Sequence, residues 1–173
     1  MNQNEYLPTK ILIPFFGKNT SLLGVEIGVL GGSGSVAMLN RMPNLKLYCI
    51  DPWEHFEGHS YEAENSQAYH DNNYEDAKRR TKEFGERVVL LKMTSDEAMN
   101  HIKEKVDFVH IDGDHRYIQV NKDIQNWKTK LKPISILSGH DWQNGDIKKA
   151  VLEEFDMSEI KLGDDFIWYH IYE

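Results

Sequence analysis

Two aspartates in the second half of the chain are placed where they could bind a metal ion together. Asp112 ends an apolar run over 106–112, and Asp141 follows another over 134–139. If both runs are parallel strands of one sheet, both carboxylates lie at its carboxyl edge, where ligands bind. Two carboxylates suit a hard divalent cation such as Mg²⁺, and His140 could add a nitrogen ligand or only support the loop. The alternative is that these acids cap helices or form turns.

Asp114 and His115 follow the first of these acids and are candidates for a general base. A hydroxyl group is almost never ionised at neutral pH, so its use as a nucleophile requires proton removal or a metal that lowers its pKa. Histidine has the better-matched pKa. Asp114 could equally cap a helix that begins near Arg116. His110 lies within a strand that we expect to be covered on both faces, where a hydrogen-bonded core histidine is the more common arrangement.

A glycine-rich turn near the N-terminus predicts a site for a nucleotide-type cofactor. It follows an apolar run and includes Gly28 and Gly32. Glycines allow positive φ and let the backbone approach a ligand closely, and Ser33 or Ser35 could cap the next helix. Glu26, just before the turn, would repel a pyrophosphate bound there. It would instead attract S-adenosylmethionine, which carries an ammonium and a sulfonium group.

Asp51 ends the next apolar run and is a second candidate for cofactor binding. In that position a carboxylate can accept hydrogen bonds from both ribose hydroxyls of a bound nucleoside, a feature that fits NAD equally well. Trp53 would then lie near the adenine ring as an aromatic wall. The alternatives are a solvated turn for Asp51 and a core position for Trp53.

Apolar runs alternate with helical patterns along the chain, which is typical of an α/β fold with a mostly parallel sheet. A helix is expected over 36–42 and another over 117–131, where Pro133 prevents continuation. The runs over 160–162 and 166–172 are too close for a helical crossover, which predicts an antiparallel hairpin at the sheet edge. Strands are expected over 22–28, 46–51, 88–93, 106–112, 134–139 and 166–172.

Composition limits the functions that this chain could have. Its 173 residues predict one domain over 1–173. A net charge of -8 leaves no basic surface for nucleic acid, and no apolar segment is long enough to span a membrane. The lone Cys49 and the absence of a signal pattern lead us to expect a cytoplasmic protein without an internal disulfide. The apolar segment 11–16 is compatible with a homo-oligomer.

These motifs, in this order, resemble the class I S-adenosylmethionine-dependent methyltransferases. Within that group the chain is similar to the small metal-dependent O-methyltransferases related to the macrolide-sugar and cephalosporin-tailoring enzymes. The resemblance covers nearly the whole chain and implies a Rossmann-like methyltransferase sandwich whose sheet ends in an inserted antiparallel strand. The segments that carry it are 25–33, 48–53, 108–117 and 136–142.

The resemblance also implies roles for individual residues. It places Ser95 beside the adenine base, although Ser95 could instead cap a helix. It places a base three residues after the first metal-binding acid, at His115, while Asp114 aligns with the base proposed in other members. One departure is the segment 132–135, KPIS, where relatives commonly have Lys-Pro-Gly-Gly. A turn that needs positive φ there must be remodelled.

The expected function is therefore S-adenosylmethionine-dependent, metal-assisted O-methylation of a small polyhydroxylated molecule, such as a sugar, a phenol or a polyketide. The long link over 52–66 could close over this acceptor. Three alternatives stay open: a non-catalytic adenosylmethionine-binding protein, an NAD-dependent oxidoreductase and a metal-dependent hydrolase. Glu26 and the terminal hairpin disfavour the oxidoreductase. A hydrolase would turn over without any adenosyl cofactor.

Overall fold

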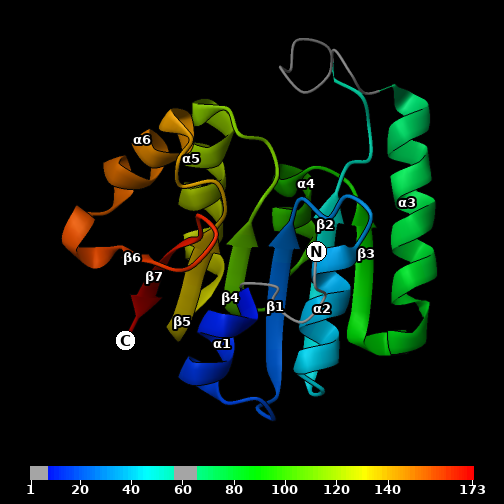
Figure 1. The fold of residues 1–173 in the computed structure, drawn as a ribbon, viewed down its shortest axis with the longest axis horizontal. Helices are drawn as coiled ribbons and strands as arrows, with labels where there is room; N and C mark the ends of the chain where they lie inside the picture. Colours follow the sequence, from blue (N-terminus) through cyan, green and yellow to red (C-terminus); the bar gives the residue numbers. More distant parts are fainter. Residues whose placement is uncertain (1–7, 57–65) are drawn as a thin grey trace.

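The computed structural model describes residues 8–56 and 66–173 and contains one mixed sheet between two layers of helices (Figure 1). Residues 57–65 of the link that could close over an acceptor lie outside the described residues. In the described part, the strand order is β3-β2-β1-β4-β5-β7-β6. The first five strands pair in parallel, and β6 and β7 form the antiparallel hairpin, which confirms the expected fold class. The strands are β1 (Leu22–Ile27), β2 (Leu45–Asp51), β3 (Val88–Lys92), β4 (Val106–Ile111), β5 (Leu131–Gly139), β6 (Lys161–Leu162) and β7 (Trp168–Tyr172).

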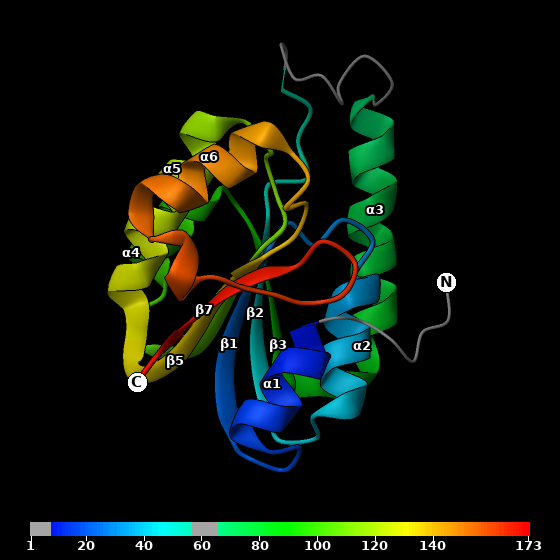
Figure 2. The same cartoon turned by 60° about the vertical axis from the view of Figure 1, so that its left-hand side comes forward.

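Helices cover both faces of the sheet, as the alternation of strands and helices predicts. Figure 2 shows α1, α2 and α3 on one face and α4, α5 and α6 on the other. None of the helices in the described ranges has the length and apolar character needed to cross a membrane. The helices are α1 (Pro8–Phe16), α2 (Ser33–Arg41), α3 (Gln67–Thr81), α4 (Ser95–His101), α5 (Tyr117–Trp127) and α6 (Gly145–Glu154), with short 3₁₀ turns η3 (Lys82–Arg87), η4 (Lys128–Lys130) and η5 (Met157–Glu159).

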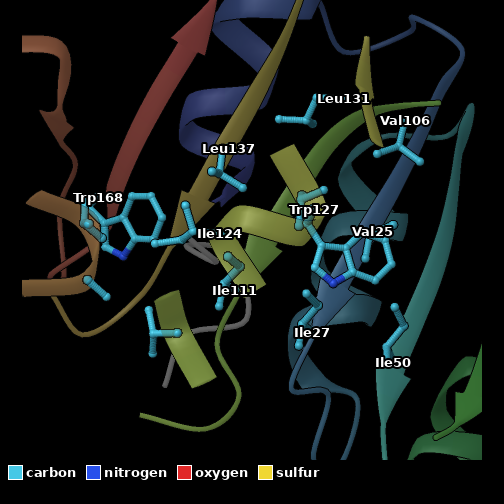
Figure 3. Close-up of a cluster of buried hydrophobic side chains, with 14 of the residues drawn as sticks. Val25, Ile27, Ile50, Val106, Ile111, Ile124, Trp127, Leu131, Leu137 and Trp168 are labelled. Carbon is cyan, nitrogen blue, oxygen red and sulfur yellow. The ribbon is translucent and has the colours of Figure 1, made fainter. Parts of the chain in front are cut away.

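Two buried apolar clusters, one on each face, hold the helices against the sheet. The cluster beneath α4, α5 and α6 includes Trp127 and Trp168 and receives alternate side chains of β1, such as Val25 (Figure 3). The cluster beneath α1, α2 and α3 includes Leu12, which is fully buried although it belongs to the apolar segment that suggested an oligomer. Burying strands on both faces leaves their carboxyl ends as the place where polar side chains can reach solvent.

The chain between α5 and β5 differs from the sequence prediction. The helix expected to reach Leu131 ends at Trp127, and Leu131 already pairs with Val106 of β4. The register then shifts, so that Phe108 pairs with Ile136. The KPIS segment forms this irregularity within β5, where a proline is tolerated because no ladder hydrogen bond is required from it.

The start of α2 also differs from the prediction. The helix begins at Ser33, three residues before the expected start, and its N-cap is Gly32 with φ 78°. No side chain makes the capping hydrogen bond there, so neither serine acts as the cap. A Cβ on Gly32 would lie 3.1 Å from the Cα of Ala77, and the left-handed backbone is itself costly for other residues. The lack of a side chain at Gly32 therefore allows α3 to pack closely against this turn.

Candidate active site

A cavity of about 2150 Å³ runs along the carboxyl edge of the sheet. Most of the residues that the sequence predicts for catalysis, metal binding or cofactor binding line this cavity. Two of the predicted residues, Gly32 and Trp53, do not line it. Those that do are Glu26, Gly28, Ser33, Asp51, Ser95, Asp112, Asp114, His115, His140 and Asp141.

The glycine turn after β1 packs directly against the turn after β4. Gly28 has φ 87°, and a Cβ there would lie 2.0 Å from the carbonyl oxygen of Asp112. The amide of Asp112 donates to the carbonyl of Ile27 at 2.8 Å, and the amide of Gly28 donates to that of Ile50 at 2.9 Å. Only glycine fits where the backbone at position 28 meets the backbone of Asp112, and this contact joins the expected cofactor loop to the expected metal loop.

Asp51 organises the glycine turn from the end of β2. Its Oδ2 accepts from the amides of Val29 at 3.0 Å and Leu30 at 2.9 Å, and its Oδ1 accepts from the amide of Trp53 at 2.8 Å. Burial raises the pKa of the Asp51 carboxyl above its ordinary value, and these backbone donors oppose the rise. The carboxylate still lines the cavity, and one lone pair, on Oδ1, is left for a ribose hydroxyl.

Trp53 takes the core position that the sequence left open as the alternative. Its side chain is 0 % exposed, and its ring packs on Tyr74 with a centroid distance of 4.7 Å. The indole Nε1 donates to the carbonyl of Leu30 at 2.8 Å. A backbone φ of 45° turns the ring away from the cavity and beneath α3. Trp53 therefore supports the glycine turn from below.

Glu26 is a buried acid in the cavity wall. It is 2 % exposed and accepts a hydrogen bond from the hydroxyl of Ser35, on the first turn of α2. Burial raises the pKa of the adjacent Cys49 thiol well above its ordinary value, and the charge of Glu26 adds to the rise. Ser33, on the same turn of α2, accepts from the guanidinium of Arg80.

Ser95 belongs to a buried polar group that the sequence does not reveal as a whole. Its hydroxyl donates to Asp123 on α5, and Gln119 Nε2 donates to Asp123 Oδ1 at 3.0 Å. The helix cap is Thr94, so Ser95 is free of that role. Burial is the main cause that raises the pKa of Asp123 to about 6. The sequence feature that could have revealed this group is Asp123 itself, an acid between Val120 and Ile124 on the apolar face of the helix. An acid rarely occupies such a position without a partner.

Four side chains converge where β4 and β5 end. Donor atoms of Asp112, His115 and Asp141 all lie within 4.8 Å of one another. His115 Nε2 is 3.0 Å from Asp141 Oδ2, and His140 Nδ1 is 3.2 Å from the same oxygen. Hydrogen bonding to Asp112 is the largest cause that raises the pKa of His115, and burial opposes it. Two carboxylates and two imidazoles fit a divalent cation, including metals that accept nitrogen ligands better than Mg²⁺ does.

The structure separates the two base candidates and His110. Asp114 is held by Arg116, whose amide and guanidinium both donate to its carboxylate. His115 instead lies within the acidic cluster. His110 is buried in β4 beside Ser138 at 3.0 Å, and burial lowers its pKa to about 4, in line with a core histidine. Among the three, His115 is the one whose imidazole lies beside both Asp112 and Asp141.

Comparison with known proteins agrees with this arrangement. A family model described as a methyltransferase domain matches residues 25–142. The uncharacterized protein y4gI of Sinorhizobium fredii is 43% identical over 53 residues, which are 30% of this chain but only 6% of that protein. The structure of the O-methyltransferase NovP superposes with a TM-score of 0.68 at 14% identity, covering 95% of this chain and 78% of that one. The Bacillus cereus O-methyltransferase in complex with SAH gives a TM-score of 0.63 at 12% identity, covering 99% and 90%.

The matched span contains the glycine turn, the end of β2 and both loops of the acidic cluster, so the family assignment covers the whole candidate site. The chain belongs to the methyltransferase domain family.

Proposed function

We propose that this protein transfers a methyl group from S-adenosylmethionine to a hydroxyl of a small polyhydroxylated molecule, with the help of a divalent cation. The observation that carries the proposal is the position of the Asp112, His115 and Asp141 cluster in the same cavity as the glycine turn. The contact between Gly28 and the carbonyl of Asp112 fixes the two parts relative to each other. A donor on one part and a hydroxyl on the other would be held in line, which supplies much of the rate in such a transfer.

The donor would occupy the part of the cavity at the carboxyl ends of β1 and β2. Asp51 would accept from a ribose hydroxyl, and the buried Glu26 would face the positively charged amino acid end. Ser95 would line the adenine end of the donor, and Ser33 would line its amino acid end. The Bacillus O-methyltransferase of the same fold, which was solved with SAH, supports this choice of donor.

The acceptor hydroxyl would lie at the Asp112, Asp141 and His140 side chains, which would hold the cation. When bound, a divalent ion lowers the pKa of a nearby hydroxyl and fixes its position. His115 would take the proton as the oxygen attacks the methyl carbon; the carbon–oxygen bond forms, the carbon–sulfur bond breaks, and the sulfonium becomes a neutral thioether. Asp141 would orient the imidazole through their 3.0 Å contact. The nitrogen ligand that His140 would supply makes Mn²⁺, Co²⁺ or Zn²⁺ stronger candidates than the Mg²⁺ expected from the acids alone.

The deciding experiment separates donor binding from metal-dependent turnover. Binding of adenosylhomocysteine and of Mn²⁺ is measured by calorimetry, and methyl transfer is followed with catechol and methyl glycosides. Chelation should abolish transfer and leave the affinity for adenosylhomocysteine nearly intact. Asp112→Asn and Asp141→Asn should both lose Mn²⁺ affinity. The matched control is Asp146→Asn, which removes a charge from the same cavity outside the cluster and should bind Mn²⁺ almost as the wild type does.

The same measurements distinguish the alternatives. Full transfer in excess chelator would eliminate the metal and leave a base-only methyltransferase. Donor binding without transfer to any acceptor would favour a non-catalytic adenosylmethionine-binding protein. Glu26→Gln and Asp51→Asn should each weaken adenosylhomocysteine binding by roughly 1–3 kcal/mol, because each removes a charge-assisted hydrogen bond. Unchanged affinity in both variants would rule out this donor site.

A further inference from the structure

The turn that joins β6 to β7 presents an exposed aromatic side chain to the cavity in a backbone conformation that disfavours it. Phe166 is 54 % exposed, and it lines the cavity together with Asp164 and Asp165. Its φ is 62°, and that of Asp165 is 56°. The amide of Ile167 donates to the carbonyl of Asp164 at 3.3 Å, which closes the turn around these two residues. A two-residue hairpin turn with positive φ at both centres is normally built from asparagine and glycine.

A phenylalanine at the second centre is therefore unfavourable for the turn and leaves its ring in contact with solvent. A bulky residue at positive φ is an outlier, and such outliers gather at ligand sites. An exposed ring on a loop is common on its own, but the combination of exposure, positive φ and a place in the cavity wall points to a bound partner for the ring.

The order of strands indicates which ligand would meet this ring. Along the carboxyl edge, the expected donor residues follow β1 and β2, the acidic cluster follows β4 and β5, and the turn precedes β7, which pairs with β5. Trp168 at the start of β7 is paired with Gly139 at the end of β5. The amide of Trp142 donates to the carbonyl of Phe166 at 2.9 Å, so the turn is attached to the residue that follows Asp141. Phe166 thus lies beyond the cluster, on the side away from the donor.

We infer that Phe166 determines acceptor specificity: its ring forms an apolar wall for the flat face of a ring-shaped acceptor whose hydroxyl is at the Asp112 and Asp141 cluster. This inference rests on the proposed O-methyl transfer. The shared chemistry is a ring with an apolar face and adjacent hydroxyls, which an aromatic diol or a deoxy sugar can provide. The ring of Phe166 contributes contact area and orientation to such a ligand and takes no part in the proton transfer.

The test compares Phe166→Gly with Asp165→Gly, a control that relieves the neighbouring positive φ without removing a ring. Binding of catechol and of a methyl 6-deoxyhexoside to the protein loaded with adenosylhomocysteine and Mn²⁺ is measured by ligand-observed NMR. Both variants should have a higher midpoint of thermal unfolding than the wild type. Phe166→Gly should weaken binding of whichever ring probe the wild type accepts by about tenfold, while Asp165→Gly binds it as the wild type does.

The two probes separate the aromatic from the sugar source, and Phe166→Asn, whose side chain tolerates positive φ, repeats the test if the glycine variant does not fold. The inference is overturned if the ring-deleted variants bind the probe as tightly as the wild type does, if their unfolding midpoints fall, or if the wild type binds neither probe. Affinities for adenosylhomocysteine and Mn²⁺ need no acceptor, so they report separately on the proposed function.

Discussion

Replacing Asp123 by asparagine should stabilise the protein at neutral pH and not at acid pH. Asp123 is 1 % exposed, and its Oδ1 accepts from Ser95 and from Gln119. Burial is the largest cause of its raised pKa; the two hydrogen bonds lower the pKa, and the charges of Asp96 and Asp114 raise it. Asparagine has almost the same shape and keeps a carbonyl oxygen for both donors, but it cannot ionise.

The size of the effect follows from the pKa. The fold raises the pKa of Asp123 from 3.8 to about 6, a rise of about 2 units that corresponds to about 3 kcal/mol. Because the unfolded chain releases this proton first, the free energy of unfolding is highest below pH 3.8 and falls as the pH rises through 6. At pH 7.5 the wild type should have lost up to about 3 kcal/mol that Asp123→Asn retains.

Urea unfolding of both proteins between pH 4 and pH 8 measures this difference. The gap in free energy of unfolding should widen between pH 4 and pH 6 and stay constant above pH 7. Asp164→Asn serves as the control, because Asp164 is paired with Lys10 at the surface and such pairs contribute little. A gap for Asp123→Asn that is the same at every pH would refute the reasoning, since it would mean that ionisation of this carboxyl carries no cost in the fold.

Three further predictions concern the two ends of the cavity. Gly28→Ala should lower the free energy of unfolding by about 2–4 kcal/mol and weaken adenosylhomocysteine binding in calorimetry, because its Cβ would overlap the carbonyl oxygen of Asp112. Wild-type stability and affinity in this variant would contradict the close contact between Gly28 and Asp112. His115→Ala should lower single-turnover methyl transfer about 100-fold, whereas Asp114→Asn should lower it less, since an arginine already occupies that carboxylate; a larger loss in Asp114→Asn would make Asp114 the base. Mn²⁺ affinity should rise from pH 6 to pH 8, because a protonated His115 beside Asp112 and Asp141 would repel the cation, and the pKa of His115 is raised; His115→Ala should show a weaker dependence.

The meeting of the two acids could be predicted from the sequence because it depends on topology alone. Apolar runs before Asp112 and Asp141 indicate parallel strands, and β4 and β5 are neighbours in the sheet. The carboxyl ends of neighbouring parallel strands lie together whatever the details of packing. The alternation of apolar side chains toward the two clusters is likewise a local pattern that a sequence carries.

Features that depend on a single backbone angle could not be predicted in this way. Trp53 follows Asp51 closely, as a residue near the adenine would, but a φ of 45° sends its ring into the core. The end of α5 at Trp127 depends on the shifted pairing of β5 with β4, which is not visible in the apolar face of the helix. The tie between Asp114 and Arg116 is also a matter of local geometry, because the same two residues could have formed a helix cap.

Strained backbone is concentrated around the cavity, and this bears on how the site keeps its shape. Among the described residues, the non-glycine positions with positive φ are Leu30, Trp53, Asp141, Asp165 and Phe166. All five lie in loops at the carboxyl edge, and each conformation costs on the order of 1–3 kcal/mol. Hydrogen bonds between these loops hold them: Trp53 donates to Leu30, and Trp142 donates to Phe166. A ligand that enters this cavity therefore meets walls whose ordering was completed during folding, so that little of its binding energy is spent on arranging them.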